Sequence, residues 1–291
     1  MTEHAPRAVV TAGTGGIGLE TALGLARRGW DVTLVARDPA RGKAAVARVD
    51  EVAGRPTGRF VRADLSSLAA TRRLGERLAA EGALNLLVNN VGGMWTERWE
   101  SPEGIEGSIA LNHLSPYVLT ETLLDALAAA APSRVVNVTS SAITAAQAVF
   151  EDAEPPGPHY GLPATGRAKL AHLAHSMELA GRLAPRGISV IAADPGAAAT
   201  GNAALMTLDI LPPAMRPFWE QIQKGVSAPV AAAATGPLAA ALDPALDRRT
   251  GLVVGPVGTV DDTLLAFVTP EVTEAVRRWT AELMAAAGQA S

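Results

Sequence analysis

The chain of 291 residues contains no cysteine, which excludes disulfide bonds, thiolate metal ligands and cysteine nucleophiles. Nowhere do about 18 uncharged apolar residues follow one another, as a membrane-spanning helix requires. The first ten residues, "MTEHAPRAVV", lack the apolar stretch and small-residue cleavage site of a secretory signal. Together these absences predict a cytoplasmic protein that does not interact with membranes.

Runs of like charge are also lacking. The net charge is -4 and the sequence pI is near 5.8, so neither a nucleic-acid surface nor a polybasic membrane anchor is expected. Apolar material is plentiful instead: 48% of the residues are hydrophobic and the mean hydropathy is +0.18. That is enough for one large core, and we expect a single domain over residues 1–291 whose partner is a small molecule.

Short β-branched runs alternate with longer helical patterns. These runs begin at Arg7, Asp31, Gly58, Leu84, Ser133, Gly187 and Gly251. Strand runs separated by room for a helix are typical of a parallel sheet with crossover helices, and nearly all-apolar strands are typical of burial on both faces. The predicted fold is α/β, a Rossmann-type doubly wound parallel sheet of about seven strands with helices on both faces. Ligands of such sheets bind at the carboxyl ends of the strands.

A glycine-rich turn, "TAGTGGIG", follows the first predicted strand and leads into a helix. Its G-x-G-x-x-G spacing permits a tight turn, close approach of the backbone to a pyrophosphate and close packing of the helix, whose N-terminus faces the phosphates. The residues expected to contact a dinucleotide are Gly13, Gly15, Gly16, Ile17 and Gly18. The alternative is a turn whose glycines serve only its sharpness.

The end of the second predicted strand, "LVARD", bears on the choice of dinucleotide. A carboxylate there would accept hydrogen bonds from the adenosine ribose and repel a 2′-phosphate. Ala36 occupies that position and Arg37 follows it, which favours NADP (NADPH) over NAD. The alternative is that Arg37 lies in solvent or pairs with Asp38.

Further motifs follow in a fixed order: "ADLSSL", "LLVNNVGG", "LNHLSPYVLT", "VVNVTSS", "AKLAH" and "DPGAAAT". With the glycine-rich turn, they make the chain resemble the short-chain dehydrogenases/reductases, and within them the retinol-dehydrogenase-like group, over residues 7–256. Several motifs in sequence are far more specific than any one alone. The resemblance implies an enzyme with this fold that transfers hydride to or from a small molecule.

The resemblance also implies roles for individual residues. The positions expected to bind the cofactor are Asp64 and Leu65 at the adenine, Asn89, Asn90 and Gly92 at the end of the fourth strand, and Pro195, Gly196 and Thr200 beside the nicotinamide amide. The positions that match the family's catalytic asparagine, serine and lysine are Asn112, Ser140 and Lys169. Lys169 is also expected to hold the cofactor ribose.

Two positions depart from the family pattern. The family's first glycine falls on Ala12, so we expect a reshaped phosphate turn. The family's Tyr-x-x-x-Lys motif places Thr165 where the tyrosine stands, four residues before Lys169 and on the same helix face. A neighbouring ammonium can lower a phenol's pKa from about 10 toward working pH, whereas a threonine hydroxyl does not titrate in that range. Thr165 can orient a water or a carbonyl but cannot by itself donate the proton.

The chain offers few substitutes for the missing phenol. Tyr117 lies in an apolar helical pattern and is expected to pack, whereas Tyr160 lies on the loop entering the helix of Lys169. Tyr160 could fold back toward Ser140; its alternative is a surface or pocket-lining role. His159 is a weaker candidate with a suitable intrinsic pKa.

Two other chemistries are disfavoured. His172 and His175 are three residues apart on a predicted helix, but no carboxylate-bearing metal motif accompanies them, so no metal site is expected. A hydrolase triad of Ser140 with a histidine and Asp194 would lack the G-x-S-x-G elbow.

The segment 201–228 is rich in Leu, Met, Pro and aromatic residues, and the resemblance makes it the substrate-binding lid. Met94, Trp95 and Trp99 are expected to border the same cleft, which predicts a hydrophobic or aromatic substrate. The alternative is an oligomer contact, since the resemblance implies a homodimer or homotetramer.

The expected activity is NADPH-dependent reduction of a carbonyl or other unsaturated group. Two alternatives stay open: a dinucleotide sensor or scaffold without redox chemistry, and a redox-neutral cyclase or isomerase. Ser140, Lys169 and Asn112 together favour an enzyme, because a sensor has no evident need for all three.

Overall fold

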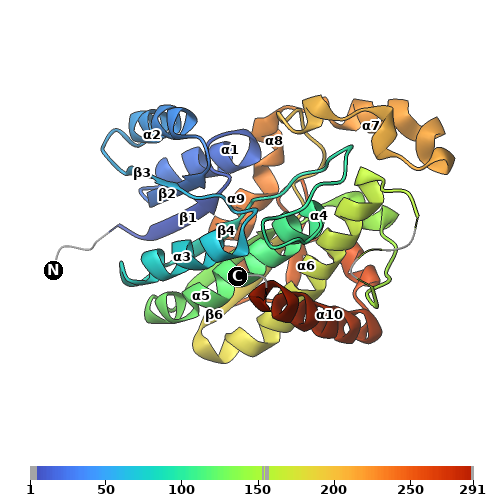
Figure 1. Cartoon of the computed structure of the whole chain (residues 1–291). Coiled ribbons are helices and arrows are strands. Elements are labelled where there is room, and N and C mark those ends of the chain that lie inside the picture. The colour runs from blue at the N-terminus through green and yellow to red at the C-terminus, as the bar shows by residue number, and fades with distance from the viewer. Residues whose placement is uncertain (1–4, 153, 155–156, 290–291) are drawn as a thin grey trace.

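A computed structural model describes residues 5–152, 154 and 157–289, and a seven-stranded parallel sheet lies at its centre (Figure 1). The spatial order is β3-β2-β1-β4-β5-β6-β7. The strands are β1 (Arg7–Thr11), β2 (Asp31–Ala36), β3 (Gly58–Arg62), β4 (Leu86–Asn89), β5 (Ser133–Val138), β6 (Ile188–Ala193) and β7 (Leu252–Val254). The predicted Rossmann-type sheet is confirmed, and its order reverses between β1 and β4, where such sheets bind ligands.

Helices connect the strands and cover the sheet. The α-helices are α1 (Gly16–Ala26), α2 (Pro39–Ala53), α3 (Leu68–Ala79), α4 (Gly107–Ile109), α5 (Ser115–Ala129), α6 (Gly161–Leu183), α7 (Trp219–Gly225), α8 (Val230–Ala233), α9 (Thr235–Leu242) and α10 (Pro270–Gln289). A π-helical turn, η1 (Ala110–Leu114), joins α4 to α5, and a 3-10 turn, η2 (Ser141–Ala145), follows β5. Local chemistry sets several starts: Asp38 caps α2 ahead of Pro39, and Ser67 caps α3.

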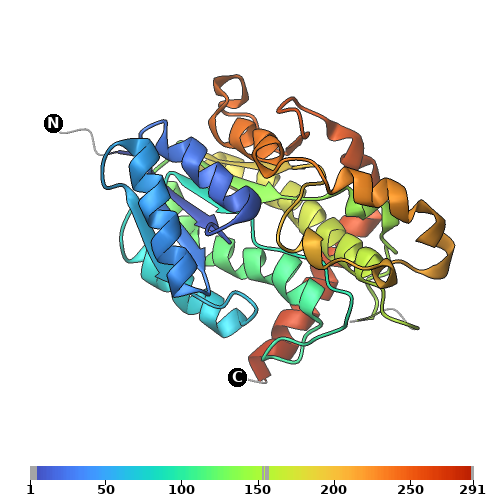
Figure 2. The same ribbon diagram turned by 90° about the horizontal axis from the view of Figure 1, so that it is seen from above.

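Side chains alternate between the two faces along each buried strand, so the sheet contributes to a core layer on each face. Val10 and Leu34 pack with α1, α2 and α9 on one face, whereas Val9 and Leu87 pack with α3, α5 and α6 on the other. Figure 2 shows the strands between these helical layers. Because the strands are parallel, the loops that follow β1, β4, β5 and β6 emerge side by side at one edge of the sheet.

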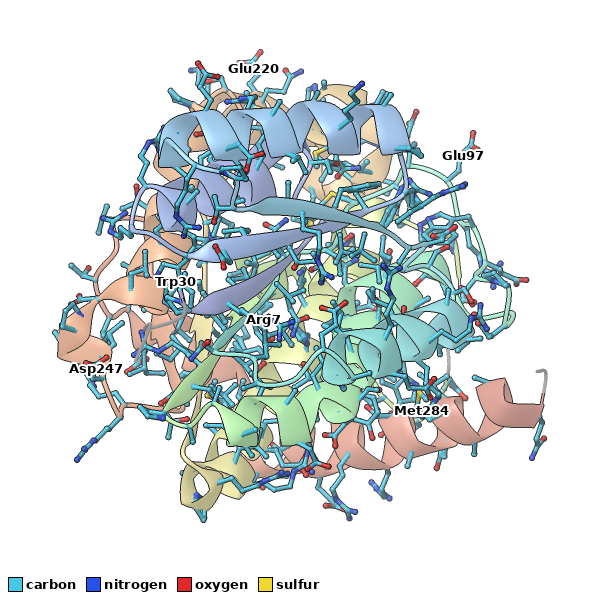
Figure 3. All side chains as sticks on the ribbon, turned by 90° about the vertical axis from the view of Figure 1, so that its left-hand side faces the viewer. Arg7, Trp30, Glu97, Glu220, Asp247 and Met284 are labelled. Atoms are coloured by element: carbon cyan, nitrogen blue, oxygen red, sulfur yellow. The ribbon has the colours of Figure 1, made fainter. Side chains whose placement is uncertain are left out.

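The segment 201–228, expected to be the substrate-binding lid, contains several short helices. Three 3-10 turns, Ala203–Leu205, Leu208–Ile210 and Pro213–Phe218, lead into α7. Figures 1 and 3 place α7 and α10 at opposite ends of the molecule, with Glu220 and Met284 marking them in Figure 3.

Among the described residues, no single helix is long and apolar enough to span a membrane. Pro213–Gly225 and Val230–Leu242 reach that length and apolarity only as a pair, which is bent by 97°.

Candidate active site

The glycine-rich turn has two residues in the left-handed region, Ala12 with φ 51° and Gly16 with φ 55°. The turn therefore keeps the conformation that favours glycine at position 12 although alanine stands there. Gly18, inside α1, has no room for a side chain, since a Cβ would lie 2.5 Å from both the Ala12 carbonyl oxygen and the Asn90 amide nitrogen. A Cβ on Gly13 would lie 2.9 Å from the Val10 carbonyl oxygen. Close packing thus explains Gly13 and Gly18, and backbone conformation explains Gly16.

Hydrogen bonds join this turn to the end of β4. The Thr11 hydroxyl accepts from the backbone N–H groups of Asn90 and Val91, both at 2.9 Å, and the Asn90 side chain donates to the Thr11 carbonyl at 3.0 Å. From the loop after β6, Thr200 lies over the turn, since its Cγ2 atom is 3.6 Å from a Cβ built on Gly16. The loops after three strands therefore meet at the N-terminus of α1.

A hollow of about 360 Å³ at the ends of β2 and β3 is lined by Arg37, Asp38, Arg62 and Asp64. Both carboxylates serve their own loops: Asp38 accepts from the N–H groups of Ala40 and Arg41, and Asp64 accepts from Ser66. Within the described part of the chain, Arg37 forms no ion pair. The alternative that Arg37 pairs with Asp38 therefore has no support in this structure.

Arg41 is a candidate binding residue that the sequence analysis missed. Its guanidinium lies against the backbone of Gly15, where a Cβ would collide with it. Arg41 is exposed in the first turn of α2, and it makes no ion pair within the described ranges. The sequence "RDPAR" could have indicated this role for Arg41. A helix that begins at Pro39 places Arg41 in its first turn, close to the end of the strand that Arg37 follows.

The turn Gly92–Gly93 after β4 is the point where the catalytic candidates meet. The Asn112 side chain exchanges two hydrogen bonds with Gly93, accepting from its N–H and donating to its carbonyl, both at 3.0 Å. A Cβ on Gly92 would collide with the Asn112 oxygen and lie 3.1 Å from the Lys169 ammonium. Asn112 lies in η1, and π-helical turns of this kind are frequent at functional sites.

Two residues of α6 point at the same turn. Thr165 donates from its hydroxyl to the Gly93 carbonyl at 3.3 Å, and Lys169 donates from its ammonium to the Val138 carbonyl at 2.7 Å. Burial lowers the pKa of Lys169 to about 8, against a smaller opposing effect of Asp194. Burial also raises the pKa of Asp194. Lys169 is thus a buried amine that keeps its proton at pH 7 but releases it more readily than an exposed lysine.

Ser140 stands at the end of β5 and caps η2, its Oγ accepting from the N–H of Ala142 at 3.1 Å. The η2 turn packs directly on α6, because a Cβ on Gly166 would collide with the Ala142 carbonyl. Ser140 therefore belongs to the same assembly as Thr165 and Lys169. Its hydroxyl proton is available to a ligand, since this bond uses only a lone pair.

Tyr160 immediately precedes α6, where its carbonyl accepts from the N–H of Ala164 at 3.1 Å. The next residue, Gly161, has no room for a Cβ beside the Trp95 carbonyl, so this helix end lies on the loop after β4. In the described ranges, no hydrogen bond joins Tyr160 to Ser140. The proposal that its phenol reaches Ser140 stays a prediction.

The remaining predicted residues are divided between the cleft and the core. Leu65 is buried, and Asn89 donates to Thr120 and Asn137, which ties β4 to α5 and β5 beneath the site. Beyond Pro195, Gly196 adopts φ 67° and its N–H donates to Asp194. Asn89 therefore supports the strand end from below and does not face the cleft.

The arrangement suits a dinucleotide along one edge of the sheet. The α1 N-terminus and the left-handed Gly16 form a cradle that suits phosphates, and the hollow beside Arg37 would lie on the adenosine side of such a ligand. Ser140, Asn112 and Lys169 gather at the other side of β1, beyond β4. A cofactor bound across the point where the strand order reverses would have its phosphates at the N-terminus of α1. Its reactive ring would lie beside Ser140, Asn112 and Lys169.

Comparison with known proteins agrees with this geometry. Residues 6–209 match the profile of the family described as short chain dehydrogenase. The human protein "Retinol dehydrogenase 13" is 36% identical over 197 residues, which are 66% of this chain and 59% of that protein. The human "Dehydrogenase/reductase SDR family member 13" is 38% identical over 192 residues, 65% of this chain and 50% of that one. The matches thus span between half and three-fifths of these relatives' own length.

Solved structures show the same fold. An uncharacterised protein from Mycobacterium paratuberculosis superposes with a TM-score of 0.72 over 96% of this chain and 93% of its own, at 24% identity. A short-chain dehydrogenase from Sphingobium yanoikuyae in complex with NADPH has a TM-score of 0.66 at 27% identity, covering 86% of this chain and 87% of that one. The RhlG/NADP complex of Pseudomonas aeruginosa has a TM-score of 0.64 at 28% identity, covering 87% and 95%.

The family profile covers the cradle of α1, the Gly92–Gly93 turn, Ser140, Lys169 and Thr200 in one continuous match. Sequence, topology and site geometry therefore lead to one conclusion: the chain belongs to the short-chain dehydrogenase/reductase family of oxidoreductases, whose fold binds NAD(P).

Proposed function

We propose that this protein is an NADPH-dependent reductase of a carbonyl or other unsaturated group in a hydrophobic or aromatic small molecule. The observation that carries the proposal is the convergence of Asn112, Thr165 and Lys169 on Gly92–Gly93, with Ser140 on the adjoining turn. A binding protein without chemistry would have no need for a buried lysine at that point.

The preference for NADPH is supported by two exposed arginines near the end of β2. Arg37 and Arg41 are exposed and have no carboxylate partner within the described residues, and no carboxylate stands at Ala36 to repel a 2′-phosphate. A guanidinium presents a fixed fork of donors that matches phosphate oxygens. Arg37 in the hollow and Arg41 beside Gly15 therefore favour the phosphorylated dinucleotide.

The bound dinucleotide would supply the hydride, and the protein's residues orient the substrate and move the proton. Ser140 donates a hydrogen bond from its hydroxyl to the substrate oxygen and orients it, and Lys169 holds a proton in reserve at its amine. Thr165 stands four residues before Lys169 and presents a hydroxyl to the same turn. We assign to Thr165 the family position of the catalytic tyrosine, with proton delivery passing through its hydroxyl or through Tyr160.

The rate enhancement that a catalytic phenol would add is limited, so a site without it can still work. General acid catalysis contributes about 10² to 10⁴ in rate, or roughly 3 to 5 kcal/mol of barrier. A site without the phenol is therefore slower, and substrates that need less protonation suit it better.

A hydrophobic substrate is supported by the apolar segment 201–228, which Asn202 ties to Met94 beside the Gly92–Gly93 turn. Leu205, Leu208 and Phe218 of the segment 201–228 are exposed, with 76%, 37% and 52% of their surfaces accessible. On the opposite loop, Trp95 packs edge to face on Trp99 at 5.2 Å between ring centroids. Exposed apolar side chains beside a polar centre are typical of a pocket for an apolar ligand.

Two measurements test the proposal. Fluorescence titration with NADPH and NADH should give the tighter dissociation constant for NADPH, and oxidation of NADPH should be detectable with a panel of aromatic and aliphatic ketones and aldehydes. Lys169→Met serves as the inactive control. Binding of neither cofactor would overturn the assignment, and binding without turnover by any panel member would favour a non-redox role.

A further inference from the structure

Three buried histidines lie behind the catalytic centre. His172 is three residues after Lys169 on α6, His113 follows Asn112 in η1, and His175 lies one turn beyond His172. Their exposed fractions are only 2%, 0% and 7%. The proposed reaction as described above uses none of them.

The rings form a connected group. The centroid of His113 lies 6.5 Å from that of His172 and 6.3 Å from that of His175. The outer histidine, His175, has its Nδ1 atom 4.0 Å from a carboxylate oxygen of Glu178, which is 37% exposed. The group therefore leads from the neighbourhood of Lys169 to the protein surface, on the side of the molecule where α10 packs.

Most of the ring nitrogens are unused by the protein. Among the described residues, four of the six are buried without a hydrogen-bond partner: Nδ1 of His113, both nitrogens of His172, and Nε2 of His175. His113 Nε2 pairs with the Thr280 hydroxyl of α10 at 2.7 Å. Buried polar atoms in folded proteins are almost always satisfied, and water is the usual partner where protein groups are lacking.

The rings are neutral at pH 7. Burial holds the pKa of His113 and His172 well below the usual value and lowers that of His175 to about 3. The nearby cations Lys169, Arg167 and Arg182 act in the same direction. A neutral imidazole has one donor and one acceptor nitrogen, so it can take a proton on one side and release one on the other without holding a net charge.

We infer that His172, His113 and His175 form a water-bridged proton relay that reloads Lys169 from the solvent at Glu178. The inference rests on the proposed reductase function. When the carbonyl carbon receives the hydride, its oxygen takes one proton from Lys169 through the Thr165 hydroxyl. The lysine is left as a neutral amine. One proton from solvent then passes along the histidines and restores the ammonium, so that one hydride and one proton are consumed for each alcohol formed.

The centroid separations suit this role. At these distances the rings are too far apart for direct hydrogen bonds in most orientations. One water molecule can bridge two ring nitrogens at about 2.8 Å from each. The neighbours on other elements supply no competing acid: α10 presents Trp279 and Thr280 to His113, and α5 presents Tyr117 to His175 at 4.8 Å between ring centroids. Burial raises the pKa of Tyr117, which leaves that phenol protonated.

The relay can be tested without cofactor or substrate. In protein labelled with ¹⁵N in its histidine rings, the relay predicts ring N–H protons of His172 and His113 that exchange rapidly with water and show magnetisation transfer to bound water. His172→Gln should slow that exchange at His113. Slowly exchanging ring protons with no contact to water would overturn the relay and leave the histidines as dry packing residues.

Kinetics provide the second arm. In His172→Gln, a single turnover of NADPH oxidation should stay within about twofold of the wild type because Lys169 is already protonated, whereas steady-state turnover should fall at least about tenfold. A small diffusible buffer should restore part of the loss. Tyr117→Phe, which keeps a ring packed on His175, should leave both rates unchanged.

His175→Gln, at the outer end of the relay, repeats the test if His172→Gln fails to fold. Unchanged steady-state turnover in the folded variant would contradict the relay. If the wild type oxidises no NADPH with any carbonyl, the proposed function fails instead, and the ring-exchange measurement still decides on the relay.

Discussion

Asn202 and Met94 exchange two hydrogen bonds, although 108 residues separate them in the chain. The Asn202 side chain accepts from the Met94 N–H at 2.9 Å and donates to the Met94 carbonyl at 3.0 Å. Asn112 makes the same paired contact with the preceding residue, Gly93. Two asparagines thus hold adjacent peptide groups, one from η1 on the core side and one from the segment 201–228.

Asn202→Ala should therefore loosen the segment 201–228 without damaging the catalytic centre. We expect KM for the substrate to rise by up to about 30-fold, since two hydrogen bonds worth about 1 kcal/mol each are lost, with a smaller change in kcat. Steady-state kinetics with an active ketone would measure this. Asn202→Asp keeps the acceptor oxygen, so its KM should lie between those of the wild type and Asn202→Ala. An unchanged KM in Asn202→Ala would show that the hydrogen bonds between Asn202 and Met94 do not shape the substrate pocket.

Arg37→Ala combined with Arg41→Ala should weaken NADPH binding and leave NADH binding nearly unchanged. Charge-assisted hydrogen bonds contribute about 1.5 to 3 kcal/mol, so the dissociation constant for NADPH should rise at least tenfold. Fluorescence titration measures both cofactors. Arg55→Ala is the matched control, because that exposed arginine pairs with Asp31 at the other end of β2. Equal loss for both cofactors would remove the phosphate assignment.

Thr165→Tyr should raise turnover. A phenol four residues before Lys169 restores a titratable donor on the same helix face, and we expect an increase of at least tenfold within the range of about 10² to 10⁴ for general acid catalysis. Thr165→Val should instead lower turnover, because it removes the hydroxyl that meets the Gly93 carbonyl. Stopped-flow oxidation of NADPH compares the three proteins. If Thr165→Val is as active as the wild type, proton delivery runs by another route.

Tyr160→Phe separates the two proton routes. If the phenol delivers the proton, its loss should lower turnover by about 10² or more. If Thr165 passes the proton from Lys169, turnover should stay within about twofold. Circular dichroism confirms that the fold is intact.

Ala12→Gly should stabilise the protein. Ala12 adopts φ 51°, a conformation that costs an L-residue roughly 1 kcal/mol and glycine almost nothing. Part of that gain is offset by the greater freedom of glycine in the unfolded chain. Ala47→Gly, at an exposed position in the interior of α2, is the control and should destabilise by about 1 kcal/mol. Denaturant unfolding measures both; a loss of stability in Ala12→Gly would show that the turn is not strained.

Stability should fall as the pH drops from 7 to 5. The buried histidines have folded pKa values below their unfolded value of about 6.5, so below that pH the unfolded chain binds protons that the folded chain does not. Each such histidine costs about 1.4 kcal/mol per pH unit once its unfolded form is protonated. His175, whose pKa is lowered to about 3, should contribute throughout this range. The carboxylates with lowered pKa values, such as Glu81, lose their contribution only at lower pH.

Urea unfolding at several pH values checks the sign and the slope. In His175→Gln the slope should be reduced by the contribution of one imidazole. A free energy of unfolding that stays constant from pH 7 to 5 would contradict the burial of these rings.

Local sequence determined the elements of the fold. Apolar runs with helical stretches between them specify parallel strands and crossovers, and Gly16, Ser67 and Pro39 act on the backbone within a few residues of their own positions. The spacing of Thr165 and Lys169 on one helix face follows from helical geometry alone. For this reason the sheet, the glycine-rich turn and the helix that carries Thr165 and Lys169 could be predicted.

Contacts between distant segments were decided only by tertiary structure. The pairing of Asn202 with Met94, the placement of Arg41 against Gly15, and the burial of His113 beneath Trp279 of α10 join residues whose neighbours in sequence give no sign of one another. Helical periodicity indicates which side of α6 is apolar, but not that α10 covers it. Such contacts depend on how complete elements pack around a shared core, and that packing is a property of the whole chain.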